Sequence, residues 1–170
     1  FNVVMTINKS SRILVNLIGI PSLLAIIYVG DSFNYLPIFS AFIAIVLFLG
    51  AREISALTIG KDGNTFIPLL LFFLAILQID RHPAISWDIP GHLLIVGITL
   101  ATMILEVFRR EAKPLLNISI LIFAFVWLGL MLGSLSTLRN FPEIGLRVTF
   151  ALFLSVWICD TSAFFFGKKF

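Results

Sequence analysis

The chain has 170 residues, of which 59% are hydrophobic and only 12% are charged, and its mean hydropathy is +1.08. Soluble domains carry about 25% charged residues, so this composition excludes a water-soluble fold and predicts an all-α, polytopic integral membrane protein. The net charge of +3 does not indicate a nucleic-acid partner, because the basic residues are scattered between apolar segments. The single cysteine, Cys159, excludes an internal disulfide.

Six apolar segments come close to the ~20 residues that cross a bilayer. In chain order they are residues 13–29, 36–51, 66–79, 91–107, 115–135 and 146–166. Polar or turn-forming residues separate them, and the third segment is the shortest. We therefore expect about six transmembrane helices in a single transmembrane domain over residues 1–170. The chain begins with Phe1 and not with methionine, and it ends at Phe170 directly after a lysine pair. We therefore expect a fragment truncated at one or both ends, and we assign it to the N-terminal part of a longer membrane protein.

The basic residues between the segments predict the orientation, because cytoplasmic loops are enriched in lysine and arginine. With a cytoplasmic N-terminus, nine of the twelve basic residues lie inside and three lie outside. The inside set is Lys9, Arg12, Arg52, Lys61, Arg109, Arg110, Lys113, Lys168 and Lys169, and the outside set is Arg81, Arg139 and Arg147. The pattern indicates a multi-pass protein of the cell membrane, inner or plasma.

Asp160 interrupts the sixth apolar segment, six residues from its inner end, which is about 9 Å along a helix. An aspartate in the middle of a transmembrane helix costs ~2.5–3.5 kcal/mol on insertion scales, so it needs a partner, a cation or a polar cavity. Helical spacing places it on one face with Val156, Ala163 and Gly167. Ala163 and Gly167 are small and leave room beside the carboxylate for a ligand. We interpret Asp160 as a metal ligand, and a pairing with another helix is the alternative.

The residues after Asp160 suit a metal-bound polyphosphate. Thr161 and Ser162 offer hydroxyl groups, and Lys168 and Lys169 offer positive charge to phosphate. The carboxylate of Asp160 would bind Mg²⁺, which prefers oxygen ligands. The lysine pair alone is also typical of a topology anchor.

Other polar residues in the apolar segments have weaker patterns. Glu53 and Glu106 lie toward the same side as Asp160 and are expected to be interfacial carboxylates, although either could line the same cavity. Asn117 is expected to form hydrogen bonds between helices. Gly129 and Gly133 form a G-x-x-x-G pattern, which favours contact between helices of one chain over a homodimer.

The stretch "VWICDTSAFFFGKKF", residues 156–170, resembles the segment W-x-x-D-T-[GSA]-A-Y-[FL]-x-G-[RK] of the phosphatidate cytidylyltransferases, the CDP-diacylglycerol synthases. The matching residues are Trp157, Asp160, Thr161, Ala163, Phe165, Gly167 and Lys168. Phe164 stands where that family usually has tyrosine. Looser likenesses occur in "LGAREISAL", residues 49–57, and "LSTLRNFPEIG", residues 135–145.

The resemblance implies an enzyme of phospholipid biosynthesis that converts phosphatidate and CTP into CDP-diacylglycerol and pyrophosphate with Mg²⁺. The main signature of that family lies nearer its C-terminus, so its catalytic residues would follow Phe170 and the chain alone is expected to be inactive. Two alternatives stay open: a CTP-dependent polyprenol or phytol kinase, and a secondary transporter that uses Asp160 as an ion relay.

The predicted topology can be tested by labelling single cysteines after Cys159 has been replaced. A cysteine at Lys61 or Lys113 should be modified only from the cytoplasmic side, and one at Ser32 or Ser86 only from outside. Modification of the Lys113 and Ser86 variants from the same side would contradict the arrangement of six spans.

Overall fold

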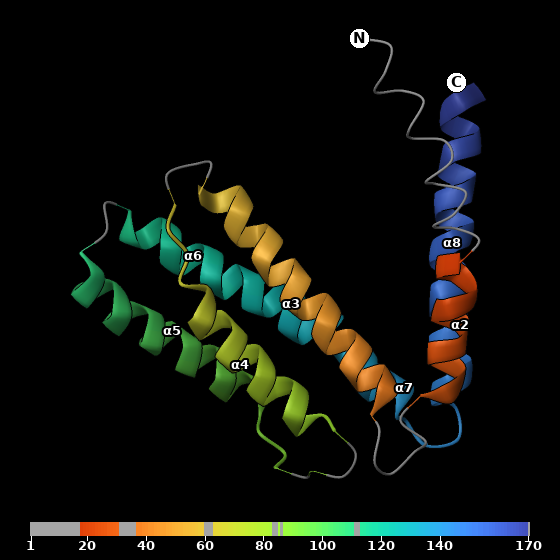
Figure 1. The fold of residues 1–170 in the computed structure, drawn as a ribbon, viewed down its shortest axis with the longest axis horizontal. Coiled ribbons are helices and arrows are strands. Elements are labelled where there is room, and N and C mark those ends of the chain that lie inside the picture. The colour runs from red at the N-terminus through yellow and green to blue at the C-terminus, as the bar shows by residue number, and fades with distance from the viewer. Residues whose placement is uncertain are drawn as a thin grey trace.

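The computed structural model describes residues 18–30, 37–59, 63–82, 85, 87–110 and 113–169, and every regular element in these ranges is helical (Figure 1). The elements are α2 (Ile20–Val29), α3 (Ile38–Ile59), α4 (Ile67–Asp80), α5 (Gly91–Arg109), α6 (Pro114–Ala124), the π-helical segment η2 (Phe125–Leu132), α7 (Ser134–Arg139) and α8 (Gly145–Lys169). This result confirms the all-helical fold class over the described residues.

Over the described residues, each predicted apolar segment coincides with helix, but one boundary was wrong. Residues 52–59 were expected to belong to a connecting loop, whereas α3 continues through them to Ile59. The stretch contains neither glycine nor proline before Gly60, so nothing in it stops a helix that has already formed.

Four helical stretches in the described ranges are long and apolar enough to cross a membrane. They are Ile38–Thr58, Gly91–Arg109, Pro114–Arg139 and Gly145–Gly167. The described part of the first segment, Ile20–Val29, and the third, Ile67–Asp80, form shorter apolar helices. The structure therefore supports four of the six expected spans by length.

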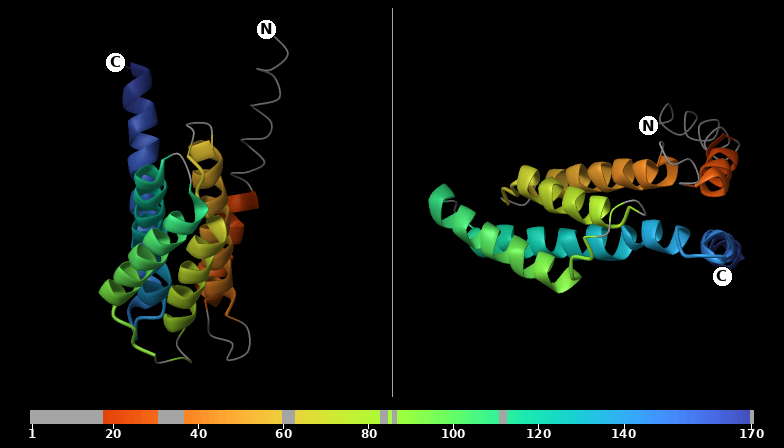
Figure 2. Two further views of the ribbon diagram at one scale, coloured as in Figure 1. Left: turned by 90° about the vertical axis from the view of Figure 1, so that its left-hand side faces the viewer. Right: turned by 90° about the horizontal axis from the view of Figure 1, so that it is seen from below.

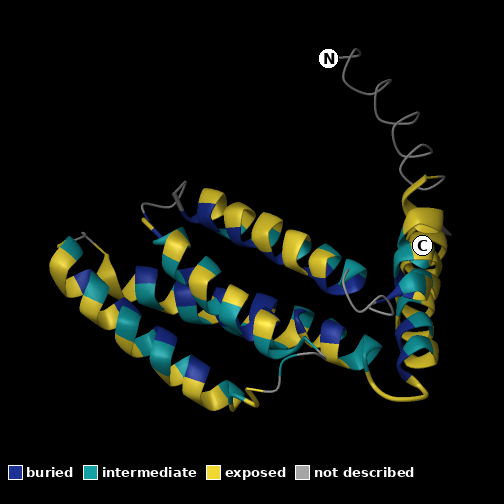
Figure 3. Cartoon of the chain, turned by 60° about the horizontal axis from the view of Figure 1, so that its bottom comes forward, coloured by how far each residue is buried: buried dark blue, intermediate teal, exposed yellow. Residues whose placement is uncertain are grey.

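Helices α3 to α6, together with η2, pack around one apolar core, and α3 and η2 each contact several of the others. Buried side chains recur about one helical turn apart, which keeps them on one face of each helix. Figure 2 shows the two layers of this bundle, and Figure 3 shows buried residues along the facing sides of its helices. The core includes Phe39, Ile43, Leu47, Leu70, Leu74, Ile98, Leu121, Phe125 and Leu128.

The G-x-x-x-G pattern serves contact within the chain, as its sequence favoured. A Cβ atom on Gly129 would lie 3.0 Å from a methyl group of Leu74 and 3.1 Å from one of Leu77, so α4 approaches closely here. Gly133 lies against Arg81, whose Nη1 donates a hydrogen bond to the carbonyl oxygen of Gly129 at 2.8 Å. Both glycines are buried by the chain's own helices.

Helices α8 and α2 lie side by side, next to the tilted bundle of α3 to α6 (Figure 1). The described contacts of α8 are chiefly with α2 and α7. Thr149, near its first turns, is fully buried, whereas every residue from 158 to 167 is exposed. Helix α8 is thus held near its beginning and extends beyond its described neighbours toward its end.

Arg139 joins α2 to the α7–α8 region. Its Nε donates to the carbonyl oxygen of Ile27 at 2.6 Å, and its Nη2 donates to that of Tyr28 at 3.1 Å. The last carbonyl groups of a helix have no partner within the helix, so the guanidinium caps α2. Gly30 follows with φ +57°, and a Cβ atom there would collide with the same guanidinium.

Replacing Arg139 by glutamine should lower the free energy of unfolding by about 2 kcal/mol, because two hydrogen bonds from a charged donor are lost. The midpoint of thermal unfolding in detergent measures the change. Arg147→Gln, at an exposed position of α8, is the matched control and should leave the midpoint unchanged. Equal midpoints for the two variants would show that Arg139 does not hold α2.

Candidate functional site

Asp160 lies on the part of α8 that extends beyond α2, and it is exposed together with Thr161, Ser162 and Ala163. Farther along the same face, a Cβ atom on Gly167 would meet no atom within 4 Å. The face that the sequence predicted from Val156 to Gly167 is therefore one continuous helical surface, and it is open.

Asp160 forms no hydrogen bond or ion pair with the residues that the structure describes. The same ranges contain no group of three or more histidine, cysteine, aspartate or glutamate side chains that could hold a metal ion. Any metal at Asp160 would therefore take its remaining ligands from substrate, water or other parts of the protein. The alternative prediction, in which Asp160 pairs with another helix, finds no partner among the described residues.

The register of α8 divides the other predicted site residues into two groups. Successive residues of an α-helix are about 100° apart, so Thr161 lies about 100° from Asp160 and Lys168 about 80° from it on the same side. Ser162 and Lys169 fall about 160–180° away, on the opposite face. The side chains of both lysines lie outside the described part of the structure. The backbone thus favours Thr161 and Lys168 over Ser162 and Lys169 as neighbours of a ligand at Asp160.

Glu106 is buried at the end of α5, where its side chain is only 2% exposed. Its Oε1 accepts a hydrogen bond from Nη1 of Arg109 at 2.9 Å, and its Oε2 accepts one from Nδ2 of Asn117 at 3.2 Å. The guanidinium of Arg109 also donates to the carbonyl oxygen of Asn64 at 2.9 Å, and the backbone N–H of Asn64 donates to Oδ1 of Asn117 at 2.8 Å. These four residues, here called the Glu106 network, tie the start of α4 to α5 and α6.

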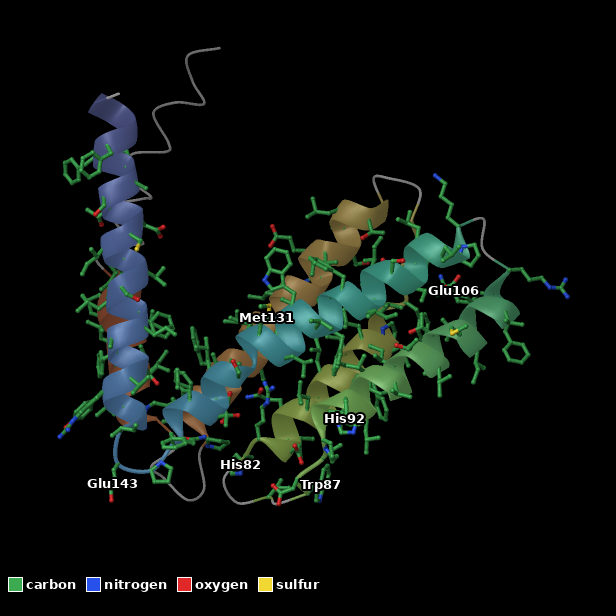
Figure 4. All side chains as sticks on the ribbon, turned by 180° about the vertical axis from the view of Figure 1, so that it is seen from behind. His82, Trp87, His92, Glu106, Met131 and Glu143 are labelled. Carbon is green, nitrogen blue, oxygen red and sulfur yellow. The ribbon has the colours of Figure 1, made fainter. Side chains whose placement is uncertain are left out.

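The Glu106 network corrects one prediction and confirms another. Figure 4 shows Glu106 on the side of the bundle away from α8, so it does not line a cavity with Asp160. Its carboxylate is occupied by partners from the chain itself. Asn117, expected to form hydrogen bonds between helices, does so with both α5 and the segment before α4. The three-residue spacing of Glu106 and Arg109 is a signal that the sequence offered for this ion pair.

Glu53 also lies apart from Asp160. It is exposed on α3 and lines a groove of about 540 Å³ between α3 and the α6–η2 rod. The structure thus distributes the three acids over three helices. Asp160 alone lies in the open face of α8 that the sequence singled out.

Replacing Glu106 by alanine should lower the free energy of unfolding by about 3 kcal/mol, because the change leaves buried charged and polar groups without a partner. Glu106→Gln should cost less, since it retains a side-chain oxygen and the packing. Chemical or thermal unfolding in detergent measures both. Glu143→Ala, at an exposed loop position, is the control. A midpoint for Glu106→Ala equal to that control would contradict a stabilising role for the Glu106 network.

Comparison with protein families gives one match. The Cytidylyltransferase family covers residues 10–170, which includes every described helix and the motif around Asp160. Among curated proteins and solved structures, none matches the chain. The match extends over nearly the whole sequence and agrees with the resemblance carried by residues 156–170. The chain belongs to the cytidylyltransferase family.

Proposed function

We propose that this protein is the phosphatidate-specific form of a membrane cytidylyltransferase, which makes CDP-diacylglycerol and pyrophosphate from phosphatidate and CTP. Membership of the family supports a nucleotidyltransferase that uses CTP. The observation that carries the lipid assignment is the open face of α8, where Asp160 is exposed on a helix apolar enough to cross a membrane.

A lipid substrate explains why an acid stands on such a helix. The acyl chains of phosphatidate stay in the bilayer, and its phosphate lies near the surface, where CTP arrives from water. We place the end of α8, the N-terminus of the protein and the nucleotide site on the cytoplasmic side of the cell membrane, in line with the distribution of basic residues. Asp160 then lies just below the surface at which the two substrates meet.

The donor set on this face fits Mg²⁺. The ion usually takes one or two protein carboxylates, with substrate phosphates and water completing six oxygen ligands. Asp160 supplies one carboxylate, and the absence of a side chain at Gly167 leaves space beside it. When bound, Mg²⁺ would offset negative charge on the phosphates of CTP.

The reaction transfers a cytidylyl group. The protein's part is to position the two substrates and to balance the negative charge of their phosphates. A phosphate oxygen of the lipid forms a bond to the α-phosphorus of CTP, the bond from that phosphorus to the bridging oxygen breaks, and pyrophosphate departs. Asp160 would hold the metal ion that the nucleotide phosphates also bind, and Lys168 and Lys169 would meet the charge of those phosphates. Thr161 and Ser162 are further hydrogen-bond donors to phosphate, of which the helical register favours Thr161.

Replacing Asp160 by asparagine tests this assignment in the intact protein. The change keeps the size of the side chain but removes the charge that a hard cation requires. We expect CTP-dependent formation of CDP-diacylglycerol to fall by at least about 100-fold, the upper end of the cost of losing a residue that supports a metal ligand. The thermal midpoint should stay unchanged, because Asp160 has no partner in the described structure.

Cys159→Ala, one position before Asp160 and also exposed, is the matched control and should retain activity. Incorporation of radiolabelled CTP into lipid measures the activity of the unchanged protein and of the two variants. Turnover by Asp160→Asn close to that of the unchanged protein would overturn the proposal. Transfer of label to an alcohol and not to phosphatidate would keep the family but change the substrate.

A further inference from the structure

The groove beside Glu53, here called the α3–α6 groove, has the dimensions of a lipid chain. It holds about 540 Å³ and is walled by Gly50, Glu53 and Leu57 on one side and by Leu116, Ile120 and Trp127 on the other. On the α6–η2 side the lining runs from Leu116 to Leu128, about 18 Å along the axis. One leaflet accounts for half of the ~30 Å hydrocarbon core, so the groove is as long as an acyl chain in one leaflet is deep.

Glu53 places a negative charge in this otherwise apolar wall. It is exposed, and no described residue donates a hydrogen bond to it or pairs with its charge. Its neighbour in sequence, Arg52, lies over the ring of Phe48 at 6.0 Å instead, and adjacent residues of a helix do not face each other. An unpaired acid within a membrane-crossing helix is costly, so the occupant of the groove must bring the missing partner.

A second groove in the same protein contains an acid whose hydrogen-bond partners the chain itself supplies. It lies between α5 and α6, holds about 500 Å³ and is also lined by a glutamate, Glu106. There the chain itself supplies Arg109 and Asn117 as partners. The two grooves are similar in size and lining, and they differ in whether the described residues provide the cation. This contrast points to an external cation at Glu53.

The position of Glu53 suits the headgroup of a lipid. Helix α3 has 22 residues, about 33 Å, and therefore exceeds the hydrocarbon core by a small margin. Glu53 lies six residues before its end at Ile59, about 9 Å along the axis. The carboxylate thus lies about 6–9 Å from the boundary between the acyl chains and the headgroups, in the half of the helix nearer its end.

We propose that the α3–α6 groove binds an acyl chain of an aminophospholipid, whose primary ammonium group pairs with Glu53. A primary ammonium group supplies both the positive charge and the hydrogen bonds that the carboxylate lacks. An anionic lipid brings phosphate toward Glu53 without a cation and is disfavoured. This lipid is therefore chemically distinct from phosphatidate, and the site is separate from Asp160.

Native mass spectrometry of the intact protein in detergent tests this site with defined lipids. The protein is mixed with equal amounts of phosphatidylethanolamine, phosphatidylcholine and phosphatidylglycerol. We expect retention of phosphatidylethanolamine to exceed that of each other lipid by about fivefold, or ~1 kcal/mol. Glu53→Gln should remove this preference, whereas Glu143→Gln, an exposed acid outside the groove, should keep it.

A second variant tests the groove itself. Ile120→Trp fills the groove with a larger apolar side chain and should reduce retention of phosphatidylethanolamine, whatever the state of Glu53. Equal retention of the three lipids by the unchanged protein, or an unaltered preference in Glu53→Gln, would overturn the proposal. A dimer in the same spectra that Ile120→Trp dissociates would also overturn it, because a second copy would then occupy the groove. Since the readout is lipid retention, these results are independent of CTP turnover.

Discussion

The hydrocarbon core of a membrane offers no water to polar groups, so each polar side chain on a membrane-crossing helix needs a partner from the protein or from a ligand. This constraint explains the contacts that hold the described helices in register. The carboxylate of Glu106 is shared between Arg109 and Asn117, and the amide of Gln78 reaches the hydroxyl of Ser136 at 2.6 Å. Apolar contacts alone would allow the helices to shift along one another. These directional hydrogen bonds fix their relative positions.

The same constraint makes the exceptions informative. Among the described residues, Asp160 and Glu53 are carboxylates on membrane-crossing helices that the chain leaves exposed and without a donor. A protein that supplies Glu106 with two partners, Arg109 and Asn117, has the means to satisfy an acid. Leaving two of them open therefore points to partners that arrive from outside the described chain, and the proposals for the two sites name different ones: a metal-bound nucleotide and a lipid amine.

Sequence reasoning located the helices well because apolar length is a local property. Over the described residues, the six apolar segments coincide with helices. The largest boundary error there arose at residues 52–59, where Arg52 and Glu53 suggested a loop although no residue of the stretch ends a helix. The shared face of Asp160, Ala163 and Gly167 was also predictable, since it follows from the period of one helix. The separation of Glu106 from Asp160 was not, because it depends on how helices are rotated and ordered around the core. The α3–α6 groove depends on the same rotations and had no sequence signal beyond a lone glutamate.

Among the described residues, α8 is held chiefly near its beginning, so a small change of tilt there moves its other end. Residues 145 to 160 span about 22 Å of helix, so a tilt of about 5° at Gly145 displaces Asp160 by about 2 Å. Functional groups must be held within about 0.5 Å of their productive positions. If the proposed nucleotide site is at Asp160, its geometry is therefore set near the start of the helix, where Gly145 packs against the backbone of Leu138 and Arg139 and where Arg139 donates hydrogen bonds to α2. The contacts at the beginning of α8 thereby control the position of residues near its other end.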